Sequence, residues 1–370
     1  MHPTIGIVGL GTMGLGIAQV FAQAGFATIA TDVHLPARDT ARARMEQALN
    51  VRLAAGKLTP EARDAALANL HIAESLSDFA PCTLIIEAII ERAEAKQTLF
   101  ASLEAIVSPN TILATNTSSI PVASIASTAQ HPDRILALHF FNPPTAMKLV
   151  ELAPHAGTSA ATLTLARQIT ETAGKTVIQC PDRPGFIVNR CARPYYGEAL
   201  ALLEEGHPAD EIDAALMAAG YRLGPFALID LIGADINLAA TEGLSAAMHN
   251  HPRYHVFPAL KAQVASGHLG RKSGQGFVYP AQTTAKANPE IALRIESTLI
   301  NEAAWLLAEG GTTPEGINTA LRLGLNFPHG PFEALAQHNT PKVLATLQSL
   351  AAQAPDALKP RYAPAPFLTR

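Results

Sequence analysis

A glycine-rich turn near the start of this 370-residue chain restricts its fold more than any other feature. The apolar run Ile5–Val8 leads into Gly9, Gly11 and Gly14, which have the spacing G-x-G-x-x-G, and a helical pattern follows over residues 12–24. Glycines at these positions permit a tight turn, close approach of the backbone to a pyrophosphate, and close packing of helix on strand. The free N–H groups of the helix would face that phosphate. The stretch therefore predicts an α/β domain with a dinucleotide site.

An acidic residue ends the next strand pattern. Asp32 follows the run ATIAT, about 20 residues after the turn, where a carboxylate can bind the 2′-hydroxyl of a ribose. No arginine stands beside it in the sequence to receive a 2′-phosphate, so the pattern favours NAD over NADP. The alternative interpretation is a glycine turn and a strand-end acid without a ligand.

The segments after Asp32 predict the organisation of the first half. Residues 35–69, interrupted by Gly56 and Pro60, read as an antiparallel helical pair in the place of a single crossover helix. Strand and helix patterns then alternate up to residue 179, which is typical of a mostly parallel sheet with helices on both faces. We therefore expect a Rossmann-like domain over residues 1–184.

From residue 185 onward only helical patterns are found, and this half repeats itself. The segment EALALLEEG resembles the later EAAWLLAEG, and each copy continues to a Gly-Pro-Phe triplet. Such self-similarity predicts two tandem all-α domains, over residues 185–280 and 285–370. We hypothesise that the two copies pack together as a pseudo-dimer within one monomeric chain. A homodimer formed through another surface is the alternative.

The composition excludes several classes of protein. A net charge of −4 provides no basic surface for nucleic acid or an anionic membrane, and no apolar run approaches the ~18 residues needed to span a bilayer. The three cysteines predict buried thiols in a reducing compartment rather than a disulfide framework. The first strand pattern begins too early for a leader peptide, so we expect a cytoplasmic location, and no motif predicts a metal site.

Four polar residues stand at positions that suggest chemistry: His139, Glu151, Ser118 and Asn189. His139 ends a strand pattern, and Glu151 lies in the apolar run KLVEL, where an unpaired carboxylate is costly to bury. A single strand-end histidine is usually structural. A His–Glu pair beside a nicotinamide would instead supply a general base whose tautomer is fixed by the carboxylate.

The chain resembles the L-3-hydroxyacyl-CoA dehydrogenase family over residues 4–280. The matching blocks occur in family order: IGIVGLGTMGLGIAQVFAQAG, IIEAIIERAEAKQTLF, ATNTSSI, LHFFNPPTAMKLVEL, GFIVNR, LGPFALIDLIG and GRKSGQGF. The resemblance implies reversible oxidation of an (S)-3-hydroxyacyl-CoA to the 3-oxoacyl-CoA with NAD, a β-oxidation step of fatty acid metabolism. It further implies that His139 is the base, that Glu151 orients it, and that Ser118 and Asn189 bind the reacting oxygen or the thioester carbonyl.

The same resemblance implies a wider set of contacts. For NAD the set is Gly9, Gly11, Thr12, Met13, Gly14, Asp32, Glu91, Lys96, Ser118, Asn142 and Lys272. The helical pair resembles the arm that contacts coenzyme A, with Lys57 as a candidate for a CoA phosphate and Ser118 as a further substrate contact. The alternative for Glu91 and Lys96 is a pair of solvated helix charges, and for Lys57 and Lys272 an ordinary surface lysine.

Two other functions remain open at this point. One is a related dehydrogenase that acts on a hydroxy acid or sugar acid without CoA. The other is a catalytically silent, crystallin-like protein that binds NAD, which would be expected to lack one of the four candidate catalytic residues. All four are present. The residues leave the acyl chain length open.

Overall fold

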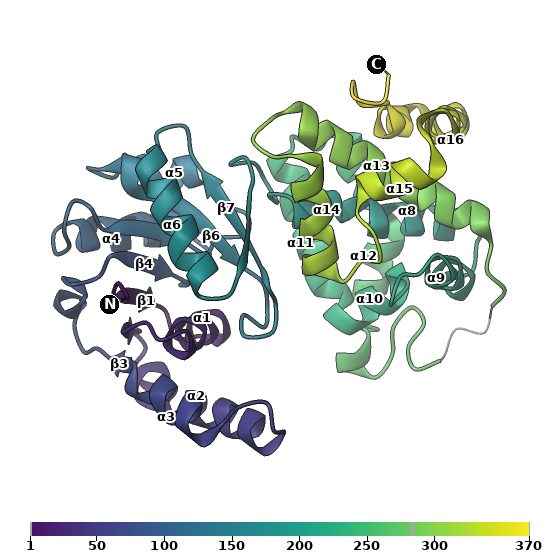
Figure 1. Ribbon diagram of the computed structural model, residues 1–370. Coiled ribbons are helices and arrows are strands. Elements are labelled where there is room, and N and C mark those ends of the chain that lie inside the picture. Colours follow the sequence, from purple (N-terminus) through teal and green to yellow (C-terminus); the bar gives the residue numbers. More distant parts are fainter. Residues whose placement is uncertain (1, 282–284, 370) are drawn as a thin grey trace. The chain divides into compact units, whose positions relative to one another are not determined.

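The computed structural model describes residues 2–281 and 285–369, and the chain forms two compact units, Met1–Arg183 and Pro184–Arg370 (Figure 1). Residues 282–284, between the two predicted helical domains, lie outside the described residues. The prediction of a Rossmann-like domain followed by an all-α part is confirmed.

The first unit is built on one eight-stranded sheet with the order β3-β2-β1-β4-β5-β6-β7-β8. All neighbouring strands are parallel except β6 and β7, which are antiparallel. The strands are β1 Ile5–Val8, β2 Thr28–Thr31, β3 Leu70–Ile72, β4 Leu84–Glu87, β5 Ile112–Thr115, β6 Ile135–Phe140, β7 Leu149–Pro154 and β8 Thr176–Gln179. The strand order reverses between β1 and β4, so the carboxyl ends of these strands border the crevice where such folds bind ligands.

Because helices cover the sheet, the side chains of its central strands are buried, and most of them are apolar. Every residue of β1, β4 and β6 is buried. The helices of this unit are α1 Thr12–Gln23, α2 Leu35–Ala54, α3 Pro60–Ala68, α4 Ala93–Glu104, α5 Val122–Ala126 and α6 Ala160–Thr172. Helices α2 and α3 pack against each other and against α1, and they form the inserted pair at one end of the unit (Figure 1).

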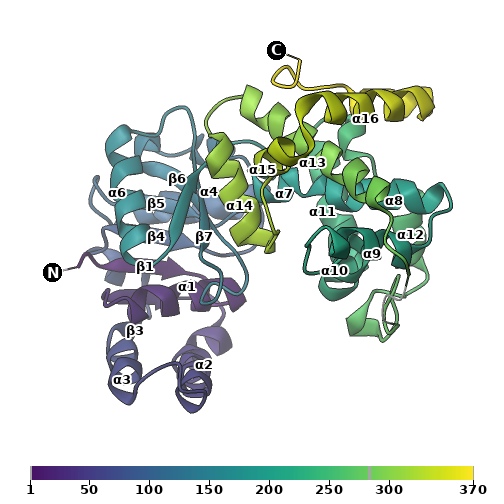
Figure 2. The same cartoon turned by 45° about the vertical axis from the view of Figure 1, so that its right-hand side comes forward.

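The regular elements described in the second unit are helical, apart from a single bridge between Gly270 and Gln275. The α-helices are α7 Val188–Cys191, α8 Arg193–Glu204, α9 Ala209–Ala218, α10 Pro225–Ile232, α11 Ala234–Ala247, α12 Pro258–Ala265, α13 Pro289–Ala308, α14 Pro314–Leu325, α15 Pro331–His338 and α16 Thr340–Gln353. The long helix α13 packs against α8, α9, α15 and α16 (Figure 2). Most residues of α13 are buried, so it is the central element of this unit.

Reciprocal ion pairs join the two similar sequence segments, and one glutamate of each segment, Glu198 or Glu302, is buried. Arg190, next to the first segment, binds Glu302 and Glu309 of the second at 2.7 Å each. Arg294, next to the second segment, binds Glu198 at 2.7 Å and Glu205 at 2.5 Å in the first. Each arginine precedes its own segment by the same number of residues. This exchange of equivalent contacts is the pattern of an isologous two-fold interface.

A second set of contacts repeats the same pattern. Tyr254 and Arg253 bind Glu302, with the tyrosine hydroxyl at 2.6 Å. Tyr362 and Arg361 bind Glu198, with the tyrosine hydroxyl at 3.0 Å. Each buried glutamate therefore meets two arginines and a tyrosine. Burial raises the pKa of Glu198, but the charges of Arg361 and Arg294 and the hydrogen bonds from Arg294 and Tyr362 outweigh this effect and lower it.

Candidate active site

The glycine turn has the geometry that a bound phosphate requires. Gly9 has a φ of +100°, and a Cβ on it would lie 2.6 Å from the carbonyl oxygen of Ala88. A Cβ on Gly14 would lie 1.8 Å from the carbonyl oxygen of Gly9, because helix and turn are in close contact. Gly11 faces open space, and as the N-cap of α1 it leaves the first N–H groups of the helix without a side-chain cap. The pyrophosphate of a dinucleotide fits these features.

Asp32 lies where β2 ends, beside the glycine turn. Its carboxylate accepts hydrogen bonds from the backbone N–H of Leu10 at 2.7 Å and of His34 at 2.8 Å. An ionised carboxylate has about four acceptor positions, so capacity for a ribose hydroxyl remains. From α2, Arg44 donates to the carbonyl oxygen of Leu10 at 3.0 Å. No sequence pattern predicts this role for Arg44, because only the fold of the helical pair brings it to the turn.

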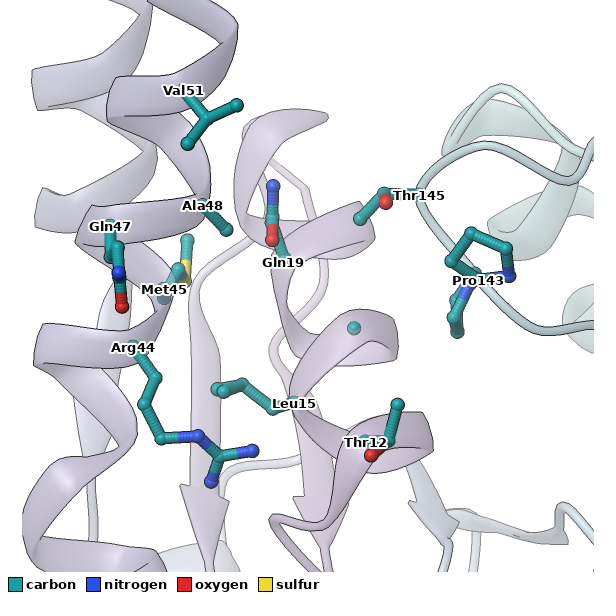
Figure 3. Close-up of a pocket in the computed structure, with 12 residues that line it drawn as sticks. Thr12, Leu15, Gln19, Arg44, Met45, Gln47, Ala48, Val51, Pro143 and Thr145 are labelled. Atoms are coloured by element: carbon teal, nitrogen blue, oxygen red, sulfur yellow. The ribbon is translucent and has the colours of Figure 1, made fainter. Parts of the chain in front are cut away.

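A pocket of about 440 Å³ lies between α1, α2 and the loop after β6 (Figure 3). It is lined by Thr12, Leu15, Gly16, Gln19, Arg44, Met45, Gln47, Ala48, Val51, Pro143, Pro144 and Thr145. In Figure 3 the guanidinium of Arg44 extends from α2 toward Leu15 of α1. Lys57, the candidate from the sequence, is exposed in the turn between α2 and α3 and is not part of this lining.

His139 and Glu151 are directly opposite each other on the antiparallel strands β6 and β7. Side chains in such a pair project to the same face of the sheet. The Nδ1 atom of His139 is 2.7 Å from Oε2 of Glu151, and the glutamate is completely buried while the histidine is 7% exposed. A neutral imidazole that donates its Nδ1 proton to the carboxylate has its basic lone pair on Nε2. The pair can therefore accept and return a proton.

Ser118 belongs to a loop that begins where β5 ends. Strands β5 and β6 are parallel neighbours, so this loop and the end of β6 lie at the same sheet edge. The side-chain oxygen of Asn116 accepts a hydrogen bond of 2.8 Å from the backbone N–H of Phe140, the residue after His139. The structure thus brings the Ser118 loop to the strand end that carries the histidine.

Glu91 and Lys96 are bonded to the protein itself. Lys96 is 1% exposed, and its ammonium lies 2.7 Å and 3.0 Å from the two carboxylate oxygens of Glu87 and 3.2 Å from Glu91. Glu91 accepts hydrogen bonds from the loop around Ser118. They are therefore not a pair of solvated helix charges.

The remaining candidates are placed as follows. Asn142 is exposed at the end of β6 and precedes Pro143, which lines the pocket. Asn189 lies in α7 of the second unit, where its carbonyl oxygen accepts a hydrogen bond of 3.1 Å from Nε of Arg193. Lys272, in a short helical turn of that unit, forms an ion pair of 2.5 Å with Asp235.

The loop around Lys272 depends on one buried carboxylate. Asp230 accepts hydrogen bonds of 2.8 Å each from the backbone N–H groups of Phe277, Val278 and Tyr279. A Cβ on Gly276 would lie 2.0 Å from an oxygen of Asp230, so the glycine is needed for this close approach. The buried carboxylate of Asp230 therefore holds this glycine-rich segment in its conformation.

The sheet order, the glycine turn and the strand-end acid define a dinucleotide-binding domain. The first unit matches the NAD-binding domain of 3-hydroxyacyl-CoA dehydrogenase over residues 4–183. The C-terminal domain of that family matches over residues 185–279 and 291–370. The chain therefore belongs to the 3-hydroxyacyl-CoA dehydrogenase family. The predictions of this family, of an oxidoreductase and of NAD as its cofactor are confirmed.

Known relatives agree with this assignment. The chain is 33% identical to 3-hydroxyadipyl-CoA dehydrogenase of Escherichia coli K12, covering 94% of this chain and 93% of the relative. It is 39% identical to a probable 3-hydroxybutyryl-CoA dehydrogenase of Deinococcus radiodurans, and the alignment covers 74% of this chain and 98% of the relative. The crystal structure of 3-hydroxybutyryl-CoA dehydrogenase from E. coli K12 aligns with a TM-score of 0.93 at 31% identity, over 100% of this chain and 98% of that one. None of the helices in the described parts of the chain has the length and apolarity to cross a bilayer.

Proposed function

We propose that this chain oxidises an (S)-3-hydroxyacyl-CoA reversibly to the 3-oxoacyl-CoA, with His139 and Glu151 as its proton-transfer centre. The observation that carries the proposal is the 2.7 Å contact between the strand-end imidazole and a fully buried carboxylate. Both lie in the unit that holds the glycine turn. A buried histidine–carboxylate pair in a dinucleotide-binding domain is suited to remove a hydroxyl proton during hydride transfer.

The roles of the side chains follow from their chemistry. Nε2 of His139 takes the proton of the 3-hydroxyl group, and the Glu151 carboxylate stabilises the imidazolium that results. The hydroxyl of Ser118 donates to the same substrate oxygen, which carries partial negative charge as the reaction proceeds. Asn189, in the second unit, is proposed as a further donor to the substrate. NAD, when bound, supplies the hydride acceptor.

Residues of the first unit would hold the cofactor at the turn. The N–H groups at the start of α1, from Thr12 and Met13 onward, would bind the pyrophosphate, and Asp32 would bind the adenosine ribose. Asn142, at the end of β6, is proposed as a contact near the nicotinamide. Lys272 is proposed as a contact from the second unit, in competition with its ion pair to Asp235.

We assign part of the CoA moiety to the pocket between α1 and α2. Arg44 is the one cation in its lining, and a guanidinium is well suited to a phosphate or pyrophosphate. Lys57 is retained as a candidate for a more distant CoA phosphate. Arg44→Ala is expected to raise the KM for acyl-CoA about tenfold, in the range of a charge-assisted hydrogen bond, whereas Lys57→Ala tests the alternative. A larger KM effect at Lys57 than at Arg44 would argue against the assignment of the pocket.

We also propose that the two helical segments form a pseudo-dimer, so that the protein is a monomer. The reciprocal ion pairs of Arg190 and Arg294 support this, because a homodimer would make equivalent contacts between two chains. Light scattering after size exclusion is expected to give the mass of one chain, 39.0 kDa. A stable homodimer would contradict the monomer.

A cytoplasmic location is proposed from the state of the thiols. Cys82, Cys180 and Cys191 are buried thiols, as expected in a reducing compartment. Fractionation of cells that express the native gene, followed by immunoblotting, tests this location.

The first test of activity is the oxidation of NADH with acetoacetyl-CoA, with free acetoacetate as the control. Turnover with the thioester alone is expected, because the proposal requires the CoA moiety. Turnover with free acetoacetate would favour the dehydrogenase of a substrate without CoA. Binding of NADH without turnover of either compound would instead favour the silent NAD-binding protein. The names of the relatives suggest two acyl groups, so 3-oxoadipyl-CoA is compared with acetoacetyl-CoA in the same assay.

A further inference from the structure

Four hydrogen-bond donors around Ser118 converge on one oxygen of Glu91. The Oε1 atom accepts from the hydroxyl of Thr117 at 2.6 Å and from the backbone N–H of Ser118 at 3.0 Å. It also accepts from the N–H of Ser119 at 3.3 Å and from its hydroxyl at 3.1 Å. Glu91 itself lies outside this loop, between β4 and α4. One carboxylate thus holds three consecutive residues of the loop in place.

The position of Glu91 is fixed by buried charges behind it. Its other oxygen lies 3.2 Å from the ammonium of Lys96, which also contacts both oxygens of Glu87. The three protons of that ammonium face three carboxylate oxygens, so its capacity to donate is used within the protein. Burial raises the pKa of Glu91, but the hydrogen bond from Thr117 and the charge of Lys96 outweigh it and lower the pKa. Glu91 is therefore ionised at neutral pH.

The other end of the loop is attached to the strand that carries His139. The backbone N–H of Asn116 donates to the carbonyl oxygen of Glu87 at 2.9 Å, and its side chain accepts from the N–H of Phe140 at 2.8 Å. Among the residues that the structure describes, none forms a hydrogen bond with the hydroxyl of Ser118. The loop is held at both ends while this hydroxyl stays available to a substrate.

We propose that Glu91 is a positioning residue for Ser118 rather than a ligand of NAD. It fixes residues 117–119 so that the Ser118 hydroxyl has a set place relative to His139. This inference rests on the proposed function, because it needs Ser118 to act on the substrate oxygen. It differs from the expectation, implied by the family resemblance, that Glu91 and Lys96 contact the cofactor, and the titration with NADH described below distinguishes the two.

A double-mutant cycle tests the proposal with Glu91→Gln, Ser118→Ala and the combined variant. A misplacement of a catalytic group by about 1 Å can lower the rate about 100-fold, so Glu91→Gln is expected to lower kcat about 10- to 100-fold. Fluorescence titration is expected to show an unchanged Kd for NADH. In the Ser118→Ala background the same change is expected to lower kcat less than about threefold, because residues that act through each other are not additive.

Two further variants separate positioning from loss of charge or of folding. Glu94→Gln removes an exposed carboxylate from the first turn of α4 and is expected to leave kcat unchanged. Thr117→Val keeps the Glu91 charge but removes the 2.6 Å bond to it, together with the bonds that the Thr117 hydroxyl accepts from the N–H groups of Ser119 and Ile120. It therefore loosens the same loop without a change of charge, and it serves if Glu91→Gln does not fold. Like Glu91→Gln, it is expected to lower kcat in the wild-type background and to have a much smaller effect in the Ser118→Ala background.

Each adverse outcome has its own meaning. A higher Kd for NADH with unchanged kcat would make Glu91 a cofactor ligand and overturn the proposal. A full kcat effect of Glu91→Gln in the Ser118→Ala background would overturn it as well, because Glu91 would then act independently of Ser118. Wild-type turnover of acetoacetyl-CoA is measured first. Its absence despite NADH binding would overturn the proposed function, and this inference with it.

Discussion

The substitution Asp213→Asn is expected to make the protein more stable at alkaline pH and to remove part of its pH dependence. Asp213 of α9 is completely buried, and its carboxylate accepts hydrogen bonds from the N–H groups of Phe226 and Ala227 at the start of α10. Burial raises its pKa from the ordinary 3.8 to about 7, although the two backbone N–H groups act in the opposite direction. The folded chain thus prefers this carboxyl group protonated.

The sign of the effect follows from this raised pKa. The folded state binds the proton more tightly than the unfolded state, so the stabilisation by Asp213 is complete below pH 4 and is lost as the pH rises to about 7. At about 1.36 kcal/mol per pKa unit, the loss approaches about 4 kcal/mol, of which about 3 kcal/mol falls between pH 5 and 8. An asparagine does not ionise. It has only one side-chain oxygen, so the hydrogen bond from the N–H of Ala227 is lost, which lowers the free energy of unfolding by about 1 kcal/mol.

Urea unfolding at several pH values between 5 and 8 measures this difference. The single tryptophan, Trp305 in α13, reports on the unit that contains Asp213. Asn318 provides a matched control, since its side-chain oxygen accepts the N–H of Phe332 at the start of α15, as Asp213 accepts that of Phe226 at the start of α10. Asn318→Asp is expected to destabilise the unit at pH 8 and much less at pH 5. Parallel stability curves of wild type and Asp213→Asn would refute the reasoning.

Three other substitutions test the first unit. His139→Ala is expected to lower kcat about 10²- to 10⁴-fold, as for a lost general base, with an unchanged Kd for NADH; a rise in that Kd together with lower thermal stability would indicate a structural role instead. Gly11→Ala, whose Cβ would face only open space, is expected to weaken NADH binding in titrations without changing the unfolding midpoint, and unchanged binding would place the phosphate elsewhere. Lys175 binds the carbonyl oxygens of Pro144 and Met147 at 2.5 and 2.8 Å, and burial lowers its pKa to about 8. Lys175→Met is expected to raise the KM for acyl-CoA by loosening a loop that lines the pocket, and the wild-type KM is expected to rise above pH 8; an unchanged KM in the variant would contradict this.

The sequence predicted the local elements of the dinucleotide site because these depend on neighbours along the chain. The glycine turn needs only a strand before it and a helix after it, and Asp32 needs only to end the next strand. The contact between His139 and Glu151 was not predictable in the same way. It depends on the register of β6 and β7, in which a shift by one residue would place the two side chains on opposite faces.

Arg44 and Glu91 illustrate what the sequence could not provide. Arg44 lies on a helix with a weak apolar pattern, and only the packing of α2 on α1 brings it to the glycine turn. In the sequence, Glu91 and Lys96 are equally compatible with exposed helix charges, because Glu87, the buried partner of Lys96, looks like part of an apolar strand. The partners of a buried charge are set by which strand ends meet, and that is a property of the sheet order.

In the second unit, the two similar segments share the residues that pack them together but not the residue that is proposed to contact the substrate. The groups that join the copies are present in both, since Arg190 and Arg294 bind equivalent glutamates. The residue before Arg190 is Asn189, a proposed substrate contact, whereas the residue before Arg294 is Leu293. If the second copy only completes the fold, it needs the ion pairs but no polar side chain at the position that corresponds to Asn189. Because both halves of this interface belong to one chain, its formation does not depend on protein concentration, in contrast to an interface between two subunits.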